Sequence, residues 1–291
     1  MPRKVPGKWP AGMIEVAPGV FGYIQGGGVT GVSNGGLIVG DDGAIAVDAL
    51  FVPKMTQKYL RAIRRTTRKP VTHLINTHHH IDHIGGNQFF RGSDIVAHIN
   101  ARHEIIRFGL PLDLLTRFIP EFAEDMKQIE ITLPTTTYAG QMTLFQADAR
   151  RGDRRVELLY MGPAHTPGDT LVYLPDEKVL FAGDIAFHYV VPGPFDCHVS
   201  GWIRVCDRAA ELDVETIVPG HGPIGTKKEM REMRDYLALV RREARRSFAA
   251  GEPEEEAARK LDVGGYYAAW ANPERLPLLV QRLYMELRGE M

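Results

Sequence analysis

Apolar and polar residues alternate along the first fifty positions of the chain. The alternation over residues 13–25 and again over 37–50, with the turn Asp41-Asp42-Gly43 inside the second stretch, predicts two β-hairpins. From 53 to 67 the apolar residues change to helical spacing, with basic residues between them. Similar patterns predict strands at 71–76, 94–99, 135–146, 155–161, 170–174, 179–182 and 216–218, and helices at 101–108, 111–128, 202–212, 227–250, 254–260 and 273–288.

Strands and helices occur in both halves of the chain, with no repeat, low-complexity tract or linker between them. This order predicts an α/β protein in which two packed β-sheets carry helices on their outer faces. We expect a single domain over residues 1–291, with a helical extension from about residue 227.

The composition is that of an ordinary globular protein. The chain is 44% apolar and 24% charged, with a formal net charge of -1. This balance argues against a nucleic-acid partner and against a membrane-surface protein. No run of about 18 apolar residues is present, and the first residues lack a signal-peptide pattern. We therefore expect a cytoplasmic location, with Cys197 and Cys206 as buried small residues.

Histidines are concentrated in one short segment. Five of the 11 histidines lie between His73 and His83, directly after the predicted strand 71–76. Neutral imidazole is the commonest metal ligand, and open α/β sheets place ligands at strand ends. In an extended loop residues two apart face the same side, so His78 and His80 can hold one ion. Asp82 and His83 can turn toward a second ion, which leaves His79 as a neighbour of the site.

Three further polar residues follow predicted strands and stand beside glycine. They are His165 after 155–161, Asp184 after 179–182, and His221 after 216–218. A lone residue of this kind is usually solvated. Their recurrence at strand ends predicts that they complete the metal site.

Together these residues resemble the pattern of the metallo-β-lactamase superfamily, which is H-x-H-x-D-H followed by distant His, Asp and His. The resemblance extends over about residues 16–223. It implies a four-layer αβ/βα sandwich with the site at one edge of two mixed sheets. It also implies that His78, His80 and His165 hold one metal, that Asp82, His83 and His221 hold a second, and that Asp184 bridges them. An aspartate at the bridging place resembles the branches that hydrolyse thioesters, lactones and phosphodiesters.

The resemblance implies a metal-dependent hydrolase. All proposed ligands offer nitrogen or oxygen, which suits two Zn²⁺ ions and would accept iron or manganese. A hydroxide between the ions would attack the carbonyl of an ester, thioester, lactone or cyclic amide, with β-lactams included. We expect Asp82 to help move the proton, and His188 or Tyr189 to donate to the oxyanion. Asp48 is either a solvated turn residue or orients a ligand histidine, and Thr166 and Asp169 are expected to fix the loop around His165.

Other functions stay open on the sequence alone. They are phosphodiester cleavage as in the nuclease branch, chemistry like that of iron-dependent persulfide dioxygenases, and metal-stabilised binding without catalysis. The expected partner is a small-molecule substrate with an apolar portion, and residues 264–284 are a candidate contact for a homo-oligomer. The substrate would lie among loops that carry Phe108, Leu110, Leu112, Phe118, Phe122, Phe195 and Trp202.

Overall fold

The two predicted hairpins open a large mixed sheet. The computed structural model describes residues 5–149 and 152–291, and within them the strands form two sheets. In the first sheet the strand order follows the chain; β1 to β4 pair antiparallel, and β4 to β7 pair parallel. Its strands are β1 (Gly12–Ala17), β2 (Val20–Ile24), β3 (Gly35–Val39), β4 (Ala44–Val47), β5 (Val71–Ile75), β6 (Asp94–His98) and β7 (Thr136–Tyr138).

The second sheet is antiparallel except at one edge. Its strand order is β12-β11-β10-β9-β8. Among the described strands of this sheet, β11 and β12 are the only parallel neighbours. The parallel pair matters because it places the carboxyl ends of two strands side by side. The strands are β8 (Gln141–Asp148), β9 (Gly152–Leu159), β10 (Leu171–Leu174), β11 (Val179–Phe187) and β12 (Thr216–His221).

Alternation along each strand explains how the sheets pack. On β3, Leu37 packs with the residues of the outer helix, whereas Ile38 joins the core between the sheets. On β11, Phe181 faces the same inner core and Leu180 faces the helices on the other side. Gly36 of the first sheet lies directly against the ring of Phe181, where any side chain would overlap it. Each sheet is therefore buried on both faces, as a sandwich with outer helices requires.

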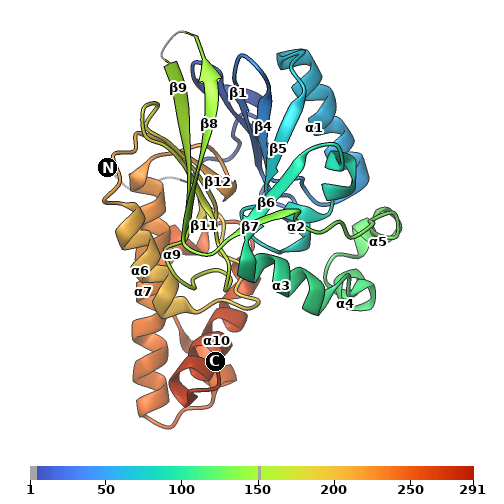
Figure 1. Cartoon of the computed structure of the whole chain (residues 1–291). Helices are drawn as coiled ribbons and strands as arrows, with labels where there is room; N and C mark the ends of the chain where they lie inside the picture. Colours follow the sequence, from blue (N-terminus) through green and yellow to red (C-terminus); the bar gives the residue numbers. More distant parts are fainter. Residues whose placement is uncertain (1–4, 150–151) are drawn as a thin grey trace.

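Helices cover both outer faces, as Figure 1 shows. Helix α1 buries Tyr59 and Ile63 against the first sheet, and α6 and α7 pack on the second. The helices after α7 continue this second core, with Leu279 and Leu283 in it. The helical segments are α1 (Pro53–Thr66), α2 (Ile81–Ile84), η1 (Asn87–Phe90), α3 (Ile99–Phe108), α4 (Leu112–Phe118), η2 (Pro120–Phe122), α5 (Ala123–Met126), α6 (Val199–Ala209), α7 (Lys227–Ala249), α8 (Glu254–Lys260), α9 (Gly264–Ala268), η3 (Pro273–Arg275) and α10 (Leu276–Arg288).

Three expectations from the sequence need correction. The predicted strand 135–146 is two strands in different sheets, because the apolar alternation continues through the corner between β7 and β8. The predicted helix 111–128 is broken at Pro120, since proline cannot donate within a helix. The strand predicted at 179–182 continues to Phe187 through a register shift at Gly183, so Asp184 lies inside β11.

No helix in the described part of the chain is both long enough and apolar enough to cross a membrane. The longest, α7, carries charged residues along much of its length and buries one face against the second sheet.

The Phe181 side chain offers a test of the inter-sheet core. Replacing Phe181 with alanine removes a ring that is 2% exposed, and we expect a loss of about 3–5 kcal/mol in the free energy of unfolding. Urea denaturation of the full chain measures this loss. Phe145→Ala is the matched control, because Phe145 lies on β8 of the same sheet with 67% exposure. Equal losses in the two variants would contradict the assigned core.

Candidate metal centre

The histidine segment leaves the carboxyl end of β5, a central strand of the first sheet. Residues 76–80 form a loop that ends in α2, a single turn in which His80 is the residue before the helix. The two glycines that follow allow this turn to pack closely on the chain after β4. A side chain at Gly85 would overlap the Phe51 carbonyl, and one at Gly86 would overlap the Ala49 carbonyl. The two glycines therefore let the turn that carries the histidines pack tightly on the segment after β4.

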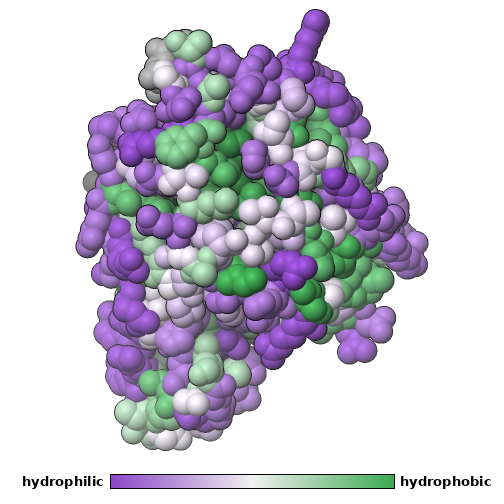
Figure 2. All heavy atoms as spheres, viewed as in Figure 1, coloured by the Kyte–Doolittle hydropathy of each residue, from purple (hydrophilic) through white to green (hydrophobic). Residues whose placement is uncertain are grey.

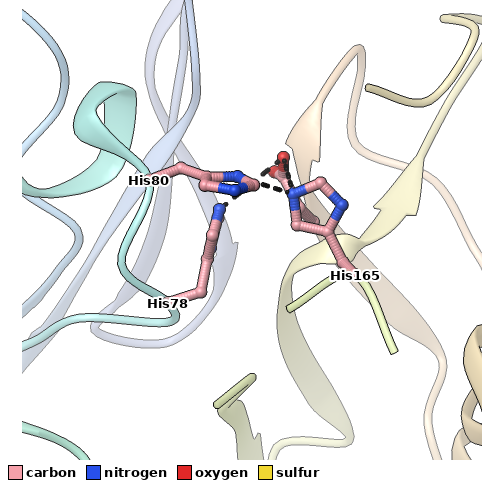
Figure 3. Close-up of side chains that lie close together, drawn as sticks. His78, His80 and His165 are labelled. Atoms are coloured by element: carbon pink, nitrogen blue, oxygen red, sulfur yellow. Dashed lines mark hydrogen bonds and ion pairs between the residues drawn. The ribbon is translucent and has the colours of Figure 1, made fainter. Parts of the chain in front are cut away.

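One group of ligands combines this loop with a loop residue and a strand residue of the second sheet. His78, His80, His165 and Asp184 each offer an atom that lies within 4.8 Å of the others. The Nε2 atom of His165 is 2.9 Å from Nδ1 of His80 and 3.1 Å from a carboxylate oxygen of Asp184. Figure 3 shows His78 and His80 from one side and His165 from the other, with their rings turned toward one another.

The second group lies beside the first. Asp82, His83 and His221 place their ligand atoms equally close together. The Oδ2 atom of Asp82 is 3.3 Å from Nε2 of His221 and 3.8 Å from Nε2 of His83. The structure thus brings together all seven residues for which the sequence predicts a metal-binding role.

Asp184 connects the two groups. One of its oxygens is 3.1 Å from Nε2 of His83, and the other is 3.4 Å from Nε2 of His221. The second oxygen also lies near the first group, 3.8 Å from Nε2 of His78. Gly220 makes this approach possible, because a side chain there would overlap the Asp184 carboxylate. A carboxylate between two sets of imidazoles is placed to be shared by two cations.

Several atoms in these groups are buried without a hydrogen bond. They include Nε2 of His78, Nε2 of His83 and Oδ1 of Asp184. Buried polar atoms are normally paired, and an orphaned one costs about 1–3 kcal/mol. Lone pairs that converge on one small space without donors suit divalent cations, which bind nitrogen and oxygen together. The residues present therefore fit a metal centre.

The surroundings of two of the histidines favour the neutral imidazole over the protonated one. Burial lowers the pKa of His78 well below its usual value and that of His165 to about 4. For Asp184, burial alone would raise the pKa, but the neighbouring His221 and His83 outweigh it and hold the pKa well below the usual range. Neutral imidazoles and an ionised carboxylate are the forms that bind metal.

Asp48 orients one of these histidines. It follows β4 with a left-handed φ of 57°, and its Oδ2 lies 2.8 Å from Nδ1 of His83. The same carboxylate accepts hydrogen bonds from the backbone N–H and the hydroxyl of Thr77, each at 2.8 Å. Of the two roles open on the sequence, the structure supports the orienting one and not the solvated turn.

Asp196 is a site residue that the sequence analysis missed. Its Oδ1 lies 2.7 Å from Nε2 of His80, and its Oδ2 lies 3.0 Å from Nε2 of His79. This contact leaves Nδ1 of His80 facing the first ligand group, and it accounts for His79 as a neighbour of the ligands. Asp196 stands 116 positions from His80 in a loop without a motif, so no spacing rule could have found it.

The loop around His165 is fixed by its own side chains. Asp169 accepts hydrogen bonds from the Thr166 backbone at 2.9 Å and from the Thr166 hydroxyl at 2.7 Å, as the sequence analysis expected. Trp202 packs behind His165, with ring centroids 4.8 Å apart, and is fully buried. Trp202 is therefore a core residue, which is the expected position for a single apolar residue, and it does not line a substrate pocket.

The hydrogen bonds of His188 and Tyr189 are made to residues outside the two ligand groups. Nδ1 of His188 lies 2.9 Å from the carbonyl of Pro223, and burial lowers the pKa of this histidine to about 4. The Tyr189 hydroxyl donates to Glu229 at the start of α7, 3.3 Å away. The geometry gives no support to the expectation that either donates to an oxyanion, and that role stays a prediction.

Exposed apolar side chains border the histidine loop. Phe108 is 49% exposed and stacks on His79 at 5.8 Å, and Phe195 is 52% exposed with its ring edge-on to His80 at 6.1 Å. Figure 2 shows apolar atoms gathered over the region where Figure 1 places α3 to α5. Leu110, Leu112 and Phe122 pack partly buried in that region, and the side chain of Phe118 lies outside the described residues.

Known proteins resemble the chain over the same segments. The family model described as the metallo-beta-lactamase superfamily matches residues 28–221. The alpha subunit of 2,4-dinitroanisole O-demethylase from Nocardioides sp. (strain JS1661) is 33% identical over 191 residues, which cover 63% of this chain and 51% of that subunit. A type 2 metallo-β-lactamase from Bacillus cereus is 24% identical over 222 residues, which cover 75% of this chain and 77% of the relative.

Solved structures share the fold at lower identity. The stereoselective inverting sec-alkylsulfatase from Pseudomonas sp. superposes with a TM-score of 0.73 at 18% identity, over 97% of this chain and 51% of the sulfatase. The chain thus spans about half the length of both the demethylase subunit and the sulfatase. The family match covers most of the chain and every residue of the two ligand groups. The chain therefore belongs to the metallo-β-lactamase superfamily, which includes hydrolases such as the β-lactamases.

Proposed function

We propose that the protein is a metal-dependent hydrolase that carries two divalent cations, with Zn²⁺ as the metal, and acts on a carbonyl compound. The observation that carries this proposal is the position of Asp184 between two groups of ligands, within 3.8 Å of the nearest nitrogen of His78, His83, His165 and His221. Structural zinc sites are usually closed four-ligand cages. Two adjacent groups that share a carboxylate instead suit hydrolysis with two metals.

The position of each residue indicates whether it would bind a cation or orient a ligand. His78, His80 and His165 would hold one cation, Asp82, His83 and His221 the other, and Asp184 both. When bound, the cations lower the pKa of water toward neutrality and polarise a substrate oxygen. Asp48 and Asp196 keep His83 and His80 in the orientation that presents the ligand nitrogen, since each accepts from the opposite ring nitrogen.

Asp82 is the residue we propose for proton movement. Its side chain is 17% exposed, against 4% for Asp184, so it lies on the side of the site that solvent reaches. Burial would raise the pKa of Asp82, but the neighbouring His83 and His221 outweigh it and lower the pKa below the usual value. An ionised Asp82 can accept the proton of the attacking water and deliver it to the leaving alcohol, thiol or amine.

The surroundings of the site suit a substrate with an apolar portion. His80 is 17% exposed, and beside it stand the exposed rings of Phe195 and, across His79, Phe108. Exposed aromatic rings beside polar ligands favour binding of an acyl chain or an aryl group. The named activity of the Bacillus cereus relative adds cyclic amides to the esters, thioesters and lactones we consider.

A second candidate function is demethylation of an aryl methyl ether. It is favoured by the 33% identity to a 2,4-dinitroanisole O-demethylase subunit, which matches 63% of this chain. The chain covers 51% of that subunit, so we rank this function below carbonyl hydrolysis. Turnover of 2,4-dinitroanisole without turnover of any carbonyl substrate would reverse the order.

Metal removal should abolish the activity. The zinc-loaded protein is assayed with chromogenic esters, thioesters, lactones, nitrocefin and bis(4-nitrophenyl) phosphate, before and after a chelator. We expect turnover of at least one carbonyl substrate, its loss with the chelator, and its return with added Zn²⁺. Carbonyl turnover that survives complete removal of the metal would contradict the proposal. Turnover of the phosphodiester alone would replace it with phosphodiester cleavage.

Substitution of the ligands should have the same effect in a folded protein. His80→Ala and Asp184→Ala should each lower kcat/KM by more than about a hundredfold, which is the upper end of the effect of outer residues that only orient ligands. Circular dichroism of each variant shows whether it is folded. Full activity in either folded variant would rule out the assigned centre.

Removal of the Asp196 charge tests its orienting role without an activity assay. Asp196→Asn should weaken Zn²⁺ binding to the metal-free protein by about 10- to 100-fold, measured by competition with a fluorescent chelator. Asp213→Asn is the control, because Asp213 forms a surface ion pair with Lys178 and its side chain is 73% exposed. Equal Zn²⁺ affinity in Asp196→Asn and the wild type would show that His80 needs no partner at this position.

A further inference from the structure

Arg275 is a buried cation that forms no ion pair with any carboxylate of the described residues. It stands at the start of α10 and is 7% exposed. Its Nη1 donates to the carbonyl of Val191 at 2.9 Å, and its Nη2 donates to the hydroxyl of Thr30 at 3.0 Å. Both acceptors are neutral, and among residues 5–149 and 152–291 Arg275 takes part in no ion pair within 4.0 Å. A buried charge is costly unless it is compensated.

Arg154, the other buried arginine among the described residues, has carboxylate partners. Arg154 forms ion pairs with Asp148 at 3.1 Å and with Glu177 at 2.7 Å. The fold thus supplies two carboxylates to a guanidinium in a purely structural place. The contrast with Arg275 indicates that its compensating charge comes from elsewhere.

The two acceptors of Arg275 belong to the loops on either side of the metal centre. Val191 lies in the segment that leads to Asp196, whose carboxylate contacts His80. Thr30 lies in the loop that carries Ser33, whose hydroxyl donates to the backbone carbonyl of Asp82. The guanidinium therefore connects two loops, each of which also holds a residue that contacts the ligand-bearing segment. Burial lowers the pKa of Arg275, and the carboxylates of Asp82 and Asp184 act on this pKa in the opposite direction.

The segment that presents Arg275 is held firmly between these loops. The amide of Asn272 donates to the Gly28 carbonyl at 2.9 Å, and the backbone of Ala271 bonds to Tyr189 at 3.0 Å and to Val191 at 2.8 Å. Asn272 itself adopts a left-handed φ of 59°. The family match ends at residue 221, so this charge is added to the site by the C-terminal helical part of the chain.

We propose that Arg275 makes the site selective for substrates that carry an anionic group, such as a carboxylate, a sulfate or a phosphate, beside their reacting bond. The inference rests on the proposed function, because it names the substrate class of that site. The positive charge of two divalent cations would exceed the negative charge of Asp82 and Asp184. The guanidinium of Arg275 adds to this net positive charge. An anionic group on the substrate supplies the missing negative charge. The two hydrogen bonds of Arg275 given above use two of its five N–H donors, and a planar guanidinium suits the oxygens of such a group.

The test compares two esters that differ in charge. The zinc-loaded full chain is assayed with neutral 4-nitrophenyl butyrate and with the mono-4-nitrophenyl ester of succinate, which ends in a carboxylate. We expect the wild type to prefer the anionic ester. In Arg275→Gln the ratio of kcat/KM for the anionic to the neutral ester should fall by about 10- to 150-fold, the loss of one hydrogen bond to a charged group. Arg275→Lys keeps the charge without the planar fork and should show a smaller fall.

Arg288→Gln is the matched control. Arg288 ends the same helix in a surface ion pair with Glu254, so its removal should leave the ratio unchanged. Zinc content is measured for each variant, which separates loss of metal from loss of anion binding. If Arg275→Gln does not fold, the lysine variant decides. An unchanged ratio in the folded Arg275 variant, or a wild type that prefers the neutral ester, overturns the proposal.

Direct binding separates this proposal from the proposed function. Calorimetry measures the affinity of succinate for the zinc-loaded wild type and for Arg275→Gln. If the wild type hydrolyses neither these esters nor any carbonyl substrate of the panel above, carbonyl hydrolysis fails as the function, and the calorimetry still decides on Arg275. Affinity at least tenfold weaker in the variant supports the anion site, and equal affinity refutes it.

Discussion

The buried carboxylate of Asp184 is the group on which the arrangement of the site depends. Its two oxygens lie 3.1–3.8 Å from nitrogens of four histidines that come from three separate segments: the one that follows β5, the loop before β10, and the end of β12. Without cations, this many lone pairs in one dry space would repel one another, and several have no hydrogen-bond donor. The fold can hold them there because these segments lie at strand ends of both sheets. The metal centre therefore depends on the packing of the two sheets, which brings the ligands together.

A series of outer contacts keeps the ligands in place. Asp48 and Asp196 each accept from the ring nitrogen that faces away from the centre, in His83 and His80 respectively. Such partners select the tautomer and the ring orientation, and they make the ligand more basic. Close packing of Gly220 against Asp184 and of Trp202 behind His165 limits the movement of the other two ligands. The centre is thus pre-organised by residues that need not touch a substrate.

Much of the fold and of the metal centre could be predicted from the sequence, and the features that could not be predicted share a physical reason. The hairpins and the strand before the histidine segment follow from periodicity, and the seven ligand residues follow from a motif of fixed order. The change of sheet between β7 and β8 leaves the alternation intact, so periodicity cannot show it. Asp196, in a loop, and Arg275, at the start of α10, make their contacts across 116 and 245 positions, and tertiary packing brings these segments together. Long-range partners of this kind leave no local signal.

The central claim is that two cations share Asp184. Zinc titration of the metal-free protein, followed by calorimetry, counts the ions directly, with Asp184→Asn measured alongside. The account predicts two Zn²⁺ per chain in the wild type and a loss of affinity at both sites in the variant. A single ion per chain in the wild type, or two ions held equally well without the Asp184 charge, would contradict it.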